Sequence, residues 1–321
     1  MIFNISMKTA SKPRAGFTLI ELSIVLVIIG LIVGGVLVGQ DLIRAAGVRA
    51  TVTQIEKYNT AVNTFRGKFG YLPGDINATA AAQFGFAARG ILAGQGDGNG
   101  VLQGDSPSGW GVGLIPFSGE TEMFWVDLSK ADLVDGSFTN NCMTALPAFI
   151  SATGMGQYMP EAKIGGGNYI YVWSGGWSEI SYYNNGQLGN SDGNNYFGLS
   201  VIMNPLVASN PASNVGLTVS QAYGIDKKMD DGMPQSGRVM AVYPNDVAWW
   251  AANGNLDPDF GQQESGDFNT GTGGPAQTGD FGDATSAGPN SCYDASSGSE
   301  QYSMQINSGA GINCVLSIRF Q

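Results

Sequence analysis

The stretch AGFTLIELSIVLVIIGLIVGGVLVGQ, residues 15–40, decides the architecture of this chain. From Phe17 to Val38 it carries a single charged residue, Glu21. A helix that rises about 1.5 Å per residue would be about 33 Å long here, which matches a bilayer core of about 30 Å. A carboxylate inside such a segment costs free energy and usually has a partner. The stretch therefore predicts a membrane-spanning helix at residues 17–38 and makes Glu21 a candidate functional residue.

The residues before this stretch indicate its orientation. Lys8, Lys12 and Arg14 lie within residues 1–16, and no acid does. The positive-inside rule keeps such an end in the cytoplasm and sends the following chain across the membrane. We therefore expect the bulk of the protein to be exported.

The small residues that suit a cleavage site come before the apolar stretch. An ordinary secretory signal is cut after its apolar region, whereas Ala15 and Gly16 precede it here. A cut between Gly16 and Phe17 leaves the helix on the mature protein, with a new α-amino group four residues from Glu21. The amine of a neighbouring copy, offset along a bundle of such helices, is a better partner for Glu21 than the amine of its own chain.

The run Gly16-Phe17-Thr18-Leu19-Ile20-Glu21-Leu22 resembles the prepilin-peptidase signature of type IV pilins and of type II secretion pseudopilins. The resemblance implies cleavage by prepilin peptidase after Gly16, N-methylation of Phe17, and pairing of Glu21 with the Phe17 amine of an adjacent subunit during assembly. Other implied partners are related pilins, an inner-membrane assembly platform, and lipid before assembly. The alternative, an uncleaved signal anchor on a monomer, leaves Glu21 unexplained.

Composition excludes several classes of function. Without residues 1–16 the chain has 12 basic and 26 acidic side chains, a net charge of −14, and no basic cluster, which argues against nucleic-acid binding. Histidine is absent, which removes Ser-His-Asp and Cys-His nucleophile systems and His-ligated zinc. We expect no enzymatic activity.

The pattern beyond the membrane segment predicts one long helix and an α+β fold. No proline occurs between Pro13 and Pro73, so one helix can run through residues 17–66. Its second half carries apolar residues three or four apart, which predicts a face packed on a head. The expected organisation is a leader at 1–16, the helix at 17–66 and a globular head at 67–321. The apolar stripe is Val48, Val52, Ile55, Tyr58, Val62, Phe65 and Phe69.

The head reads as an antiparallel sheet with short helices and many glycine turns. The runs NYIYVWSGG, WSEISYYNNG and NYFGLSVIM recur about every ten residues, which suggests a meander. A capped amphipathic helix is expected near residues 118–136, a short helix follows residue 217, and the last strand covers Val315 to Phe320. The inner face of the first helix is predicted to hold Met123, Phe124, Leu128 and Leu133.

Three cysteines, Cys142, Cys292 and Cys314, lie in the part expected to be exported. Disulfides are favoured in oxidising compartments, and an odd number leaves one thiol over. The nearer pair, Cys292 and Cys314, is the favoured disulfide, similar to the C-terminal staple of many pilins. The alternative is that Cys142 takes one of the two.

The loop GQGDGNGVLQGD, residues 94–105, is a candidate calcium site. Calcium takes six to eight oxygen ligands on a chain that turns sharply. Asp97, Asn99 and the Val101 carbonyl are expected to converge, as in the first half of an EF-hand, although the next acidic ligand of that pattern is missing. Some pseudopilins hold calcium in their heads. The alternative is a plain glycine turn in which Asp97 and Asn99 cap backbone groups.

Further ligands are needed to complete this calcium shell, and a second acidic group is available. Asp105, Glu120 and Glu122 are the candidates to complete it. The second and weaker candidate site is formed by Asp226, Asp230 and Asp231.

Three functions fit the sequence, and they share the same helix. We favour a structural subunit of a type IV pilus-type filament, held in the bacterial inner membrane with its head outside the cytoplasm before assembly. The first alternative is a pseudopilin of a type II secretion system in a periplasmic pseudopilus. The second is a minor tip pilin that binds a carbohydrate or surface through residues 253–291 and a set of aromatic side chains. Because these aromatic residues alternate along predicted strands, about half of them should lie in the core and be unavailable for binding. The set comprises Tyr169, Tyr171, Trp173, Trp177, Tyr182 and Tyr183.

Overall fold

The computed structural model divides the chain into two compact units, Met1–Ala45 and Ala46–Gln321, which are described separately. Gly16, Phe17, Cys142, Asp105 and the 253–291 segment lie outside the described residues. The described residues are 18–90, 95–102, 119–138, 152–174, 194–203, 212–214, 216–234, 236–241, 292–294 and 301–320.

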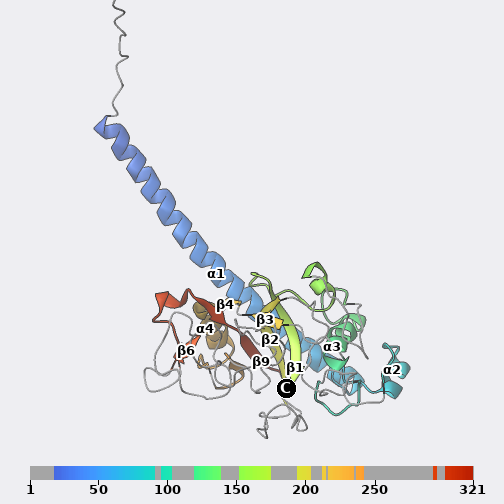
Figure 1. The fold of residues 1–321 in the computed structure, drawn as a ribbon. Coiled ribbons are helices and arrows are strands. Elements are labelled where there is room, and N and C mark those ends of the chain that lie inside the picture. The colour runs from blue at the N-terminus through green and yellow to red at the C-terminus, as the bar shows by residue number, and fades with distance from the viewer. Residues whose placement is uncertain are drawn as a thin grey trace, which may run out of the picture. The chain divides into compact units, whose positions relative to one another are not determined.

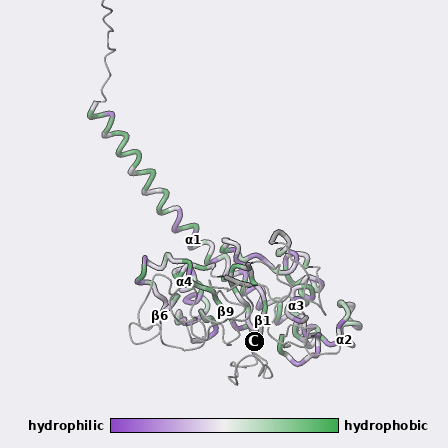
Figure 2. Tube along the Cα trace, viewed as in Figure 1, coloured by the Kyte–Doolittle hydropathy of each residue, from purple (hydrophilic) through white to green (hydrophobic). Residues whose placement is uncertain are grey.

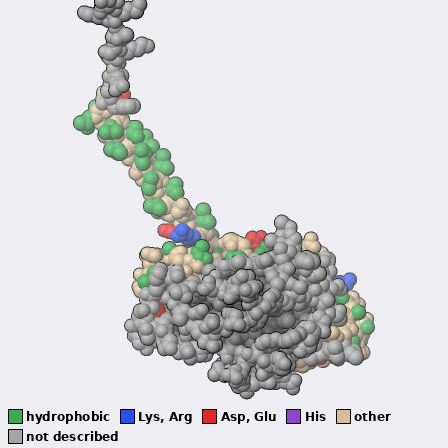
Figure 3. Space-filling model, in the orientation of Figure 1, with side chains coloured by type: hydrophobic (Ala, Val, Ile, Leu, Met, Phe, Trp, Pro, Cys, Tyr) green, Lys and Arg blue, Asp and Glu red, His purple; other side chains and the backbone are tan. Residues whose placement is uncertain are grey.

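One helix, α1, runs over Leu19–Phe69 and contributes to both units. The helix was predicted to end at residue 66 and ends at Phe69 instead. The next residue, Gly70, takes a left-handed φ of 78°. In the first unit its large hydrophobic side chains, from Leu19 to Ile43, are exposed. Figure 2 colours most of this segment hydrophobic, and Figure 3 shows hydrophobic side chains along the face in view. Of the described residues, this is the helix that is long and apolar enough to cross a membrane.

In the second unit α1 buries the predicted apolar stripe. Val48, Ile55, Tyr58, Val62 and Phe65 are buried, while Val52 and Phe69 are half-buried against the same core. The three-to-four spacing of these residues places them on one face of the helix. This face explains why the second unit begins at Ala46, before the end of the helix.

The main sheet of the head has five antiparallel strands. Its order is β1-β2-β9-β5, with β3 paired to β2. The strands are β1 (Asn168–Ser174), β2 (Asn195–Met203), β3 (Ala212–Asn214), β5 (Val239–Met240) and β9 (Leu316–Arg319). The fold is therefore α+β, as predicted.

The order of the strands corrects the predicted meander. The first and third predicted strands, β1 and β2, pair directly, with Tyr171 opposite Gly198. The run predicted between them, at 177–186, lies outside the described residues. The strand latest in sequence, β9, lies between β2 and β5. A repeat of about ten residues gives strand spacing along the chain, but it does not give the order of strands in the sheet.

Short helices flank the sheet (Figure 1). Helix α3 (Gly119–Lys130) contacts β1, whereas α4 (Val219–Met229) contacts β5 near the other edge. Inside α3, Met123, Phe124 and Leu128 are fully buried as predicted, and Leu133 is half-buried beyond its end. The remaining elements are α2 (Ala78–Phe84), the 3-10 helices η1 (Ala152–Gln157) and η2 (Asn307–Gly309), and the strand pairs β4–β8 (Leu217–Thr218, Ile312–Cys314) and β6–β7 (Tyr293–Asp294, Gln301–Tyr302).

Aromatic side chains join α1, α3 and the sheet in one core. The Tyr58 ring of α1 meets the Trp125 ring of α3 edge to face, with centroids 5.0 Å apart. Phe197 of β2 stacks on Phe320 at 4.3 Å. Such pairs contribute about 0.5–1.5 kcal/mol beyond the area that they bury. They fix the second half of α1 to the head.

Candidate functional site

The start of α1 is closed by a reciprocal pair, Thr18 and Glu21. The backbone N–H and the hydroxyl of Thr18 donate to Glu21 Oε2 at 2.8 and 2.9 Å. The Glu21 N–H donates to the Thr18 hydroxyl oxygen at 3.3 Å. This arrangement is a capping box, in which a Thr before the helix and a Glu three residues later satisfy each other's backbone donors. The pattern T-x-x-E at residues 18–21 is the signal in the sequence that predicts such a box.

The apolar segment that follows Glu21 offers an all-round contact surface. Apart from the adjoining residues and backbone of their own helix, Gly30, Gly34, Gly35 and Gly39 have no described atom within 4 Å of where a side chain would begin. Small residues allow neighbouring helices to approach closely. The segment can therefore pack against lipid or against other helices of its kind.

Glycine and acidic side chains also build a loop at residues 95–102. Asp97 accepts hydrogen bonds from the backbone and side-chain amides of Asn99, at 3.0 and 2.9 Å. Asn99 Oδ1 in turn accepts the Val101 N–H at 2.7 Å. Both side chains thus cap backbone groups, as the turn interpretation expects.

The structure adds to this loop a carboxylate that the sequence analysis missed. Asp75, which is 1% exposed, accepts the N–H groups of Gly98 and Gly100 at 2.7 and 2.8 Å. Glu120, at the start of α3, accepts the Gly96 N–H at 2.8 Å. Oxygen atoms of Asp75, Asp97 and Glu120 lie within 4.8 Å of one another.

The remaining predicted calcium ligands are placed differently. Glu122 is buried on α3, and its carboxylate is not part of the three-carboxylate group, while Asp105 lies outside the described residues. The carboxylate that was missed, Asp75, belongs to the PGD turn at 73–75. It could not be assigned to the loop from the sequence, because only the fold brings the two segments together. Gly74 must be glycine there, since a Cβ would lie 2.2 Å from the Glu120 carbonyl oxygen.

Burial sets the electrostatics of this group. Burial raises the pKa of the Asp75 carboxyl to about 7, and the neighbouring Asp97 adds to the rise, while the N–H bonds from Gly100 and Gly98 oppose it. A cation would favour the ionised form of such a group. Calcium binding by these carboxylates stays a prediction.

A separate buried ion pair, also missed in the sequence, lies at α3. Arg89 reaches both carboxylate oxygens of Asp127 at 2.5 Å, and both side chains are almost fully buried. Asp127 also accepts the Gly74 N–H at 2.7 Å. These contacts hold the 74–75 turn against α3.

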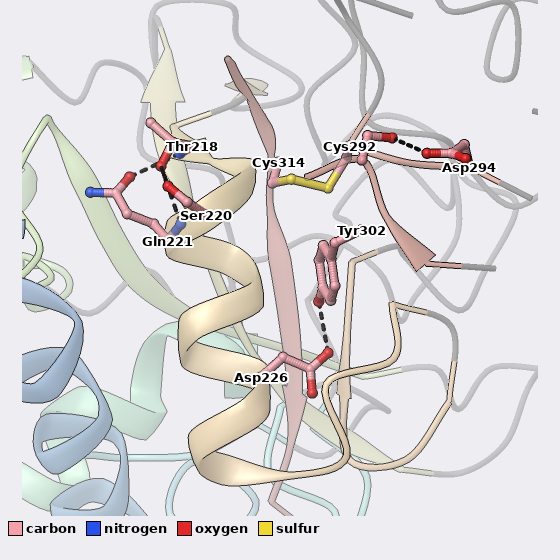
Figure 4. The surroundings of a disulfide bond; sticks show 9 residues. Thr218, Ser220, Gln221, Asp226, Cys292, Asp294, Tyr302 and Cys314 are labelled. Carbon is pink, nitrogen blue, oxygen red and sulfur yellow. Dashed lines mark hydrogen bonds between the residues drawn. A yellow bond between two sulfur atoms is a disulfide. The ribbon is translucent and has the colours of Figure 1, made fainter. Parts of the chain in front are cut away.

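A disulfide joins Cys292 and Cys314, the pairing that the sequence favoured (Figure 4). Next to it, the Tyr302 hydroxyl donates to Asp226 Oδ2 of α4 at 2.7 Å (Figure 4). Asp226, Asp230 and Asp231 bring carboxylate oxygens within 4.8 Å of one another. Burial raises the pKa of Asp226 to about 7; the bonds from Tyr302 and Gly232 lower it, and Asp231 and Asp230 raise it.

The aromatic platform proposed for an adhesin-like site is partly core. Tyr171 is 2% exposed and its hydroxyl oxygen accepts a hydrogen bond from the Ser200 hydroxyl at 3.2 Å, whereas Tyr169 is half-buried. Trp177, Tyr182 and Tyr183 lie outside the described residues. Tyr171 is therefore not available to stack on a ligand.

The comparisons with known proteins concern the start of the chain. Residues 11–37 match the prokaryotic N-terminal methylation motif. No curated protein and no solved structure matches the chain. The motif spans Gly16, Phe17, the Thr18–Glu21 capping box and most of the exposed apolar segment of α1. By this motif, the chain carries the signature of the type IV pilins and pseudopilins.

Proposed function

We propose that this chain is a structural subunit of a type IV pilus-type extracellular filament, anchored in the inner membrane before assembly. The observation that carries the proposal is the first part of α1, an exposed apolar helix with one carboxylate at its beginning. Apolar side chains on every face suit lipid before assembly and a helix bundle after it. The motif occurs in proteins that are structural rather than catalytic, and we propose no enzymatic role.

Assembly in this proposal joins unlike surfaces of neighbouring copies. Each copy offers one Phe17 amine and one Glu21 carboxylate at different heights along the helix. Contacts between unlike surfaces build an open helix when the rotation between copies does not close into a ring. The partners are other copies or related pilins, prepilin peptidase and an assembly platform in the inner membrane.

The experiment is to find where the assembled protein lies. Cells that express the chain are sheared, and filaments in the medium are collected, imaged and probed for the mature chain with Phe17 at its N-terminus. We expect the mature chain in extracellular filaments. Mature chain that stays with periplasmic assemblies of a secretion system would make it a pseudopilin instead. If the mature chain forms only a small fraction of the filament subunits and is found only at filament tips, it would be a minor subunit.

A further inference from the structure

A groove of about 360 Å³ runs along the head half of α1 beside the end of the main sheet. Four of its residues recur at spacings of three and four on α1, so they share one face of the helix. Two arginines and one aromatic ring come from the sheet side. The lining residues are Glu56, Asn59, Thr60, Asn63, Arg238, Arg319 and Phe320.

The two arginines of this groove differ in whether an acidic side chain balances their charge. Arg238 pairs with Glu56 at 3.2 Å, so its charge is already balanced. Arg319, the last residue of β9, is exposed, and among the described residues its guanidinium has neither an ion pair nor a hydrogen bond. Counted over the residues that the structure describes, the groove therefore holds one uncompensated positive charge.

Two further polar atoms of the groove lack partners. Asn59 Oδ1 and Arg238 Nε are buried and make no hydrogen bond. Buried polar atoms without hydrogen-bond partners cost free energy. A carboxylate oxygen that reached Arg238 Nε could accept its hydrogen bond, whereas Asn59 Oδ1 is an acceptor and would need a donor such as a backbone N–H of the same occupant. The groove thus suits an occupant that brings a negative charge and hydrogen-bonding atoms.

The distribution of charge along the chain favours an acidic protein partner. Arg238 and Arg319 are the only basic residues after Lys228, while the mature chain has 26 acids against 12 basic residues. Each copy is therefore rich in acidic side chains that complement this groove. It carries few other basic side chains that could compete for those acids. Complementary charges steer association and fix register.

We propose that the groove receives an acidic side chain of a second copy of this chain, with Arg319 as the residue that binds it. The inference rests on the proposed filament function and names a second contact between copies, in the head and apart from Glu21. The contact joins unlike surfaces, as the assembly of an open helix requires. It would set which rotation and rise between copies the filament accepts.

Charge reversal in the groove tests the contact in full-length protein. Arg319→Glu should reduce sheared filaments about tenfold or more, because it faces the incoming carboxylate with a like charge. Lys228→Glu, at an exposed position of α4 outside the groove, makes the same change in net charge and should assemble normally. Protease resistance of the head and the Cys292–Cys314 disulfide report whether both variants fold. Normal filament numbers for folded Arg319→Glu would overturn the inference.

Crosslinking identifies the occupant. Arg319→Lys keeps the charge and introduces an amine that a zero-length carbodiimide joins to a carboxylate in contact. Filaments grown after cells are moved from ¹⁴N to ¹⁵N medium contain light and heavy copies from the same membrane, and would show the crosslink between a light and a heavy copy if the partner is a second copy. A crosslink from this position only to Glu56 of the same chain, to a different protein, or to nothing would refute it.

The two proposals fail in different ways. Wild-type protein that makes no filament of any kind removes the proposed function and this inference with it. Wild-type filaments that tolerate Arg319→Glu leave the proposed function intact and remove the groove contact alone.

Discussion

Glu21 Oε2 accepts two hydrogen bonds from Thr18, one from its backbone N–H at 2.8 Å and one from its hydroxyl at 2.9 Å. The Glu21 carboxylate therefore has a hydrogen-bond partner in its own chain, at the residue before the helix. A capping box needs only hydrogen-bonding oxygens, whereas pairing with an amine needs the negative charge. The two roles can be separated by removing the charge and keeping the shape.

We predict that Glu21→Gln folds and inserts in the membrane but forms few filaments. Glutamine serves in a capping box as glutamate does, so the start of α1 stays intact while the charge for the neighbour's amine is lost. Membrane fractionation and counts of sheared filaments measure the two effects. Thr18→Ala is the matched control, because it removes the cap at a cost of about 1 kcal/mol and keeps the acid. If Glu21→Gln assembles like the wild type, capping is the role of this residue.

We predict that Gly16→Leu blocks processing. The peptidase acts at a residue with no side chain, so a bulky replacement should leave the precursor uncleaved, unmethylated and in the inner membrane. Mass spectrometry of the N-terminus reads the outcome directly. The wild-type chain should begin at methylated Phe17, and a terminus at another residue would contradict the assignment.

We predict that calcium raises the melting temperature of the full-length protein in detergent. Binding to the folded state alone stabilises it in proportion to the logarithm of ligand concentration, and Asp75, Asp97 and Glu120 supply three carboxylates close together. Asp97→Ala should abolish the response. Glu161→Gln, an exposed acid outside both acidic groups, should keep it. Identical melting of the wild type in calcium and in chelator would leave the turn interpretation.

We predict that Asp226 makes the head less stable as pH rises from about 4 to about 7. Its pKa is raised from 3.8 to about 7 in the folded protein, mainly by burial, so between these values the folded state binds more protons than the unfolded state. Stability then falls with rising pH, by about 1.4 kcal/mol for each pKa unit of difference. Asp226→Asn cannot ionise and should flatten this part of the melting-temperature profile. An unchanged slope in Asp226→Asn would contradict the prediction.

We predict that loss of the Cys292–Cys314 disulfide lowers the free energy of unfolding by about 3 kcal/mol. In the chain-entropy model this is the stabilisation expected from a crosslink that closes a loop of this size in the unfolded chain. The two cysteines are separated by 22 residues. The double variant Cys292→Ser, Cys314→Ser should melt at a lower temperature than the oxidised wild type. Reduced wild type should match the variant. Thiol titration of the unreduced, denatured protein should find one thiol, that of Cys142.

Local patterns predicted much of this fold. The apolar spacing along α1 identified its buried stripe, since Ile55 and Phe65 meet a core whichever sheet lies beneath them. In α3 the same reasoning placed Phe124 and Leu128. The strands β1, β2 and β9 were recognisable because β-branched and aromatic residues cluster between glycine and asparagine turns.

What the sequence did not yield depends on contacts between distant segments. Asp75 became part of the acidic loop because the fold brings the 73–75 turn beneath Gly98 and Gly100. The Arg89–Asp127 pair likewise joins residues 38 positions apart. The groove at Arg319 needed the position of β9 beside α1, and no spacing in the sequence gives this position.

The place of β9 in the sheet also bears on the order in which the head folds. Every other strand that the structure describes precedes β9 in the chain, yet β9 pairs with both β2 and β5. Until it emerges, those two strands each present an unpaired edge, which is a template for wrong pairing between chains. Under the proposed export, the sheet can be completed only after residues 316–319 have crossed the membrane. During this interval, the anchored α1 would hold each unfinished head at the membrane, where it needs protection from its neighbours.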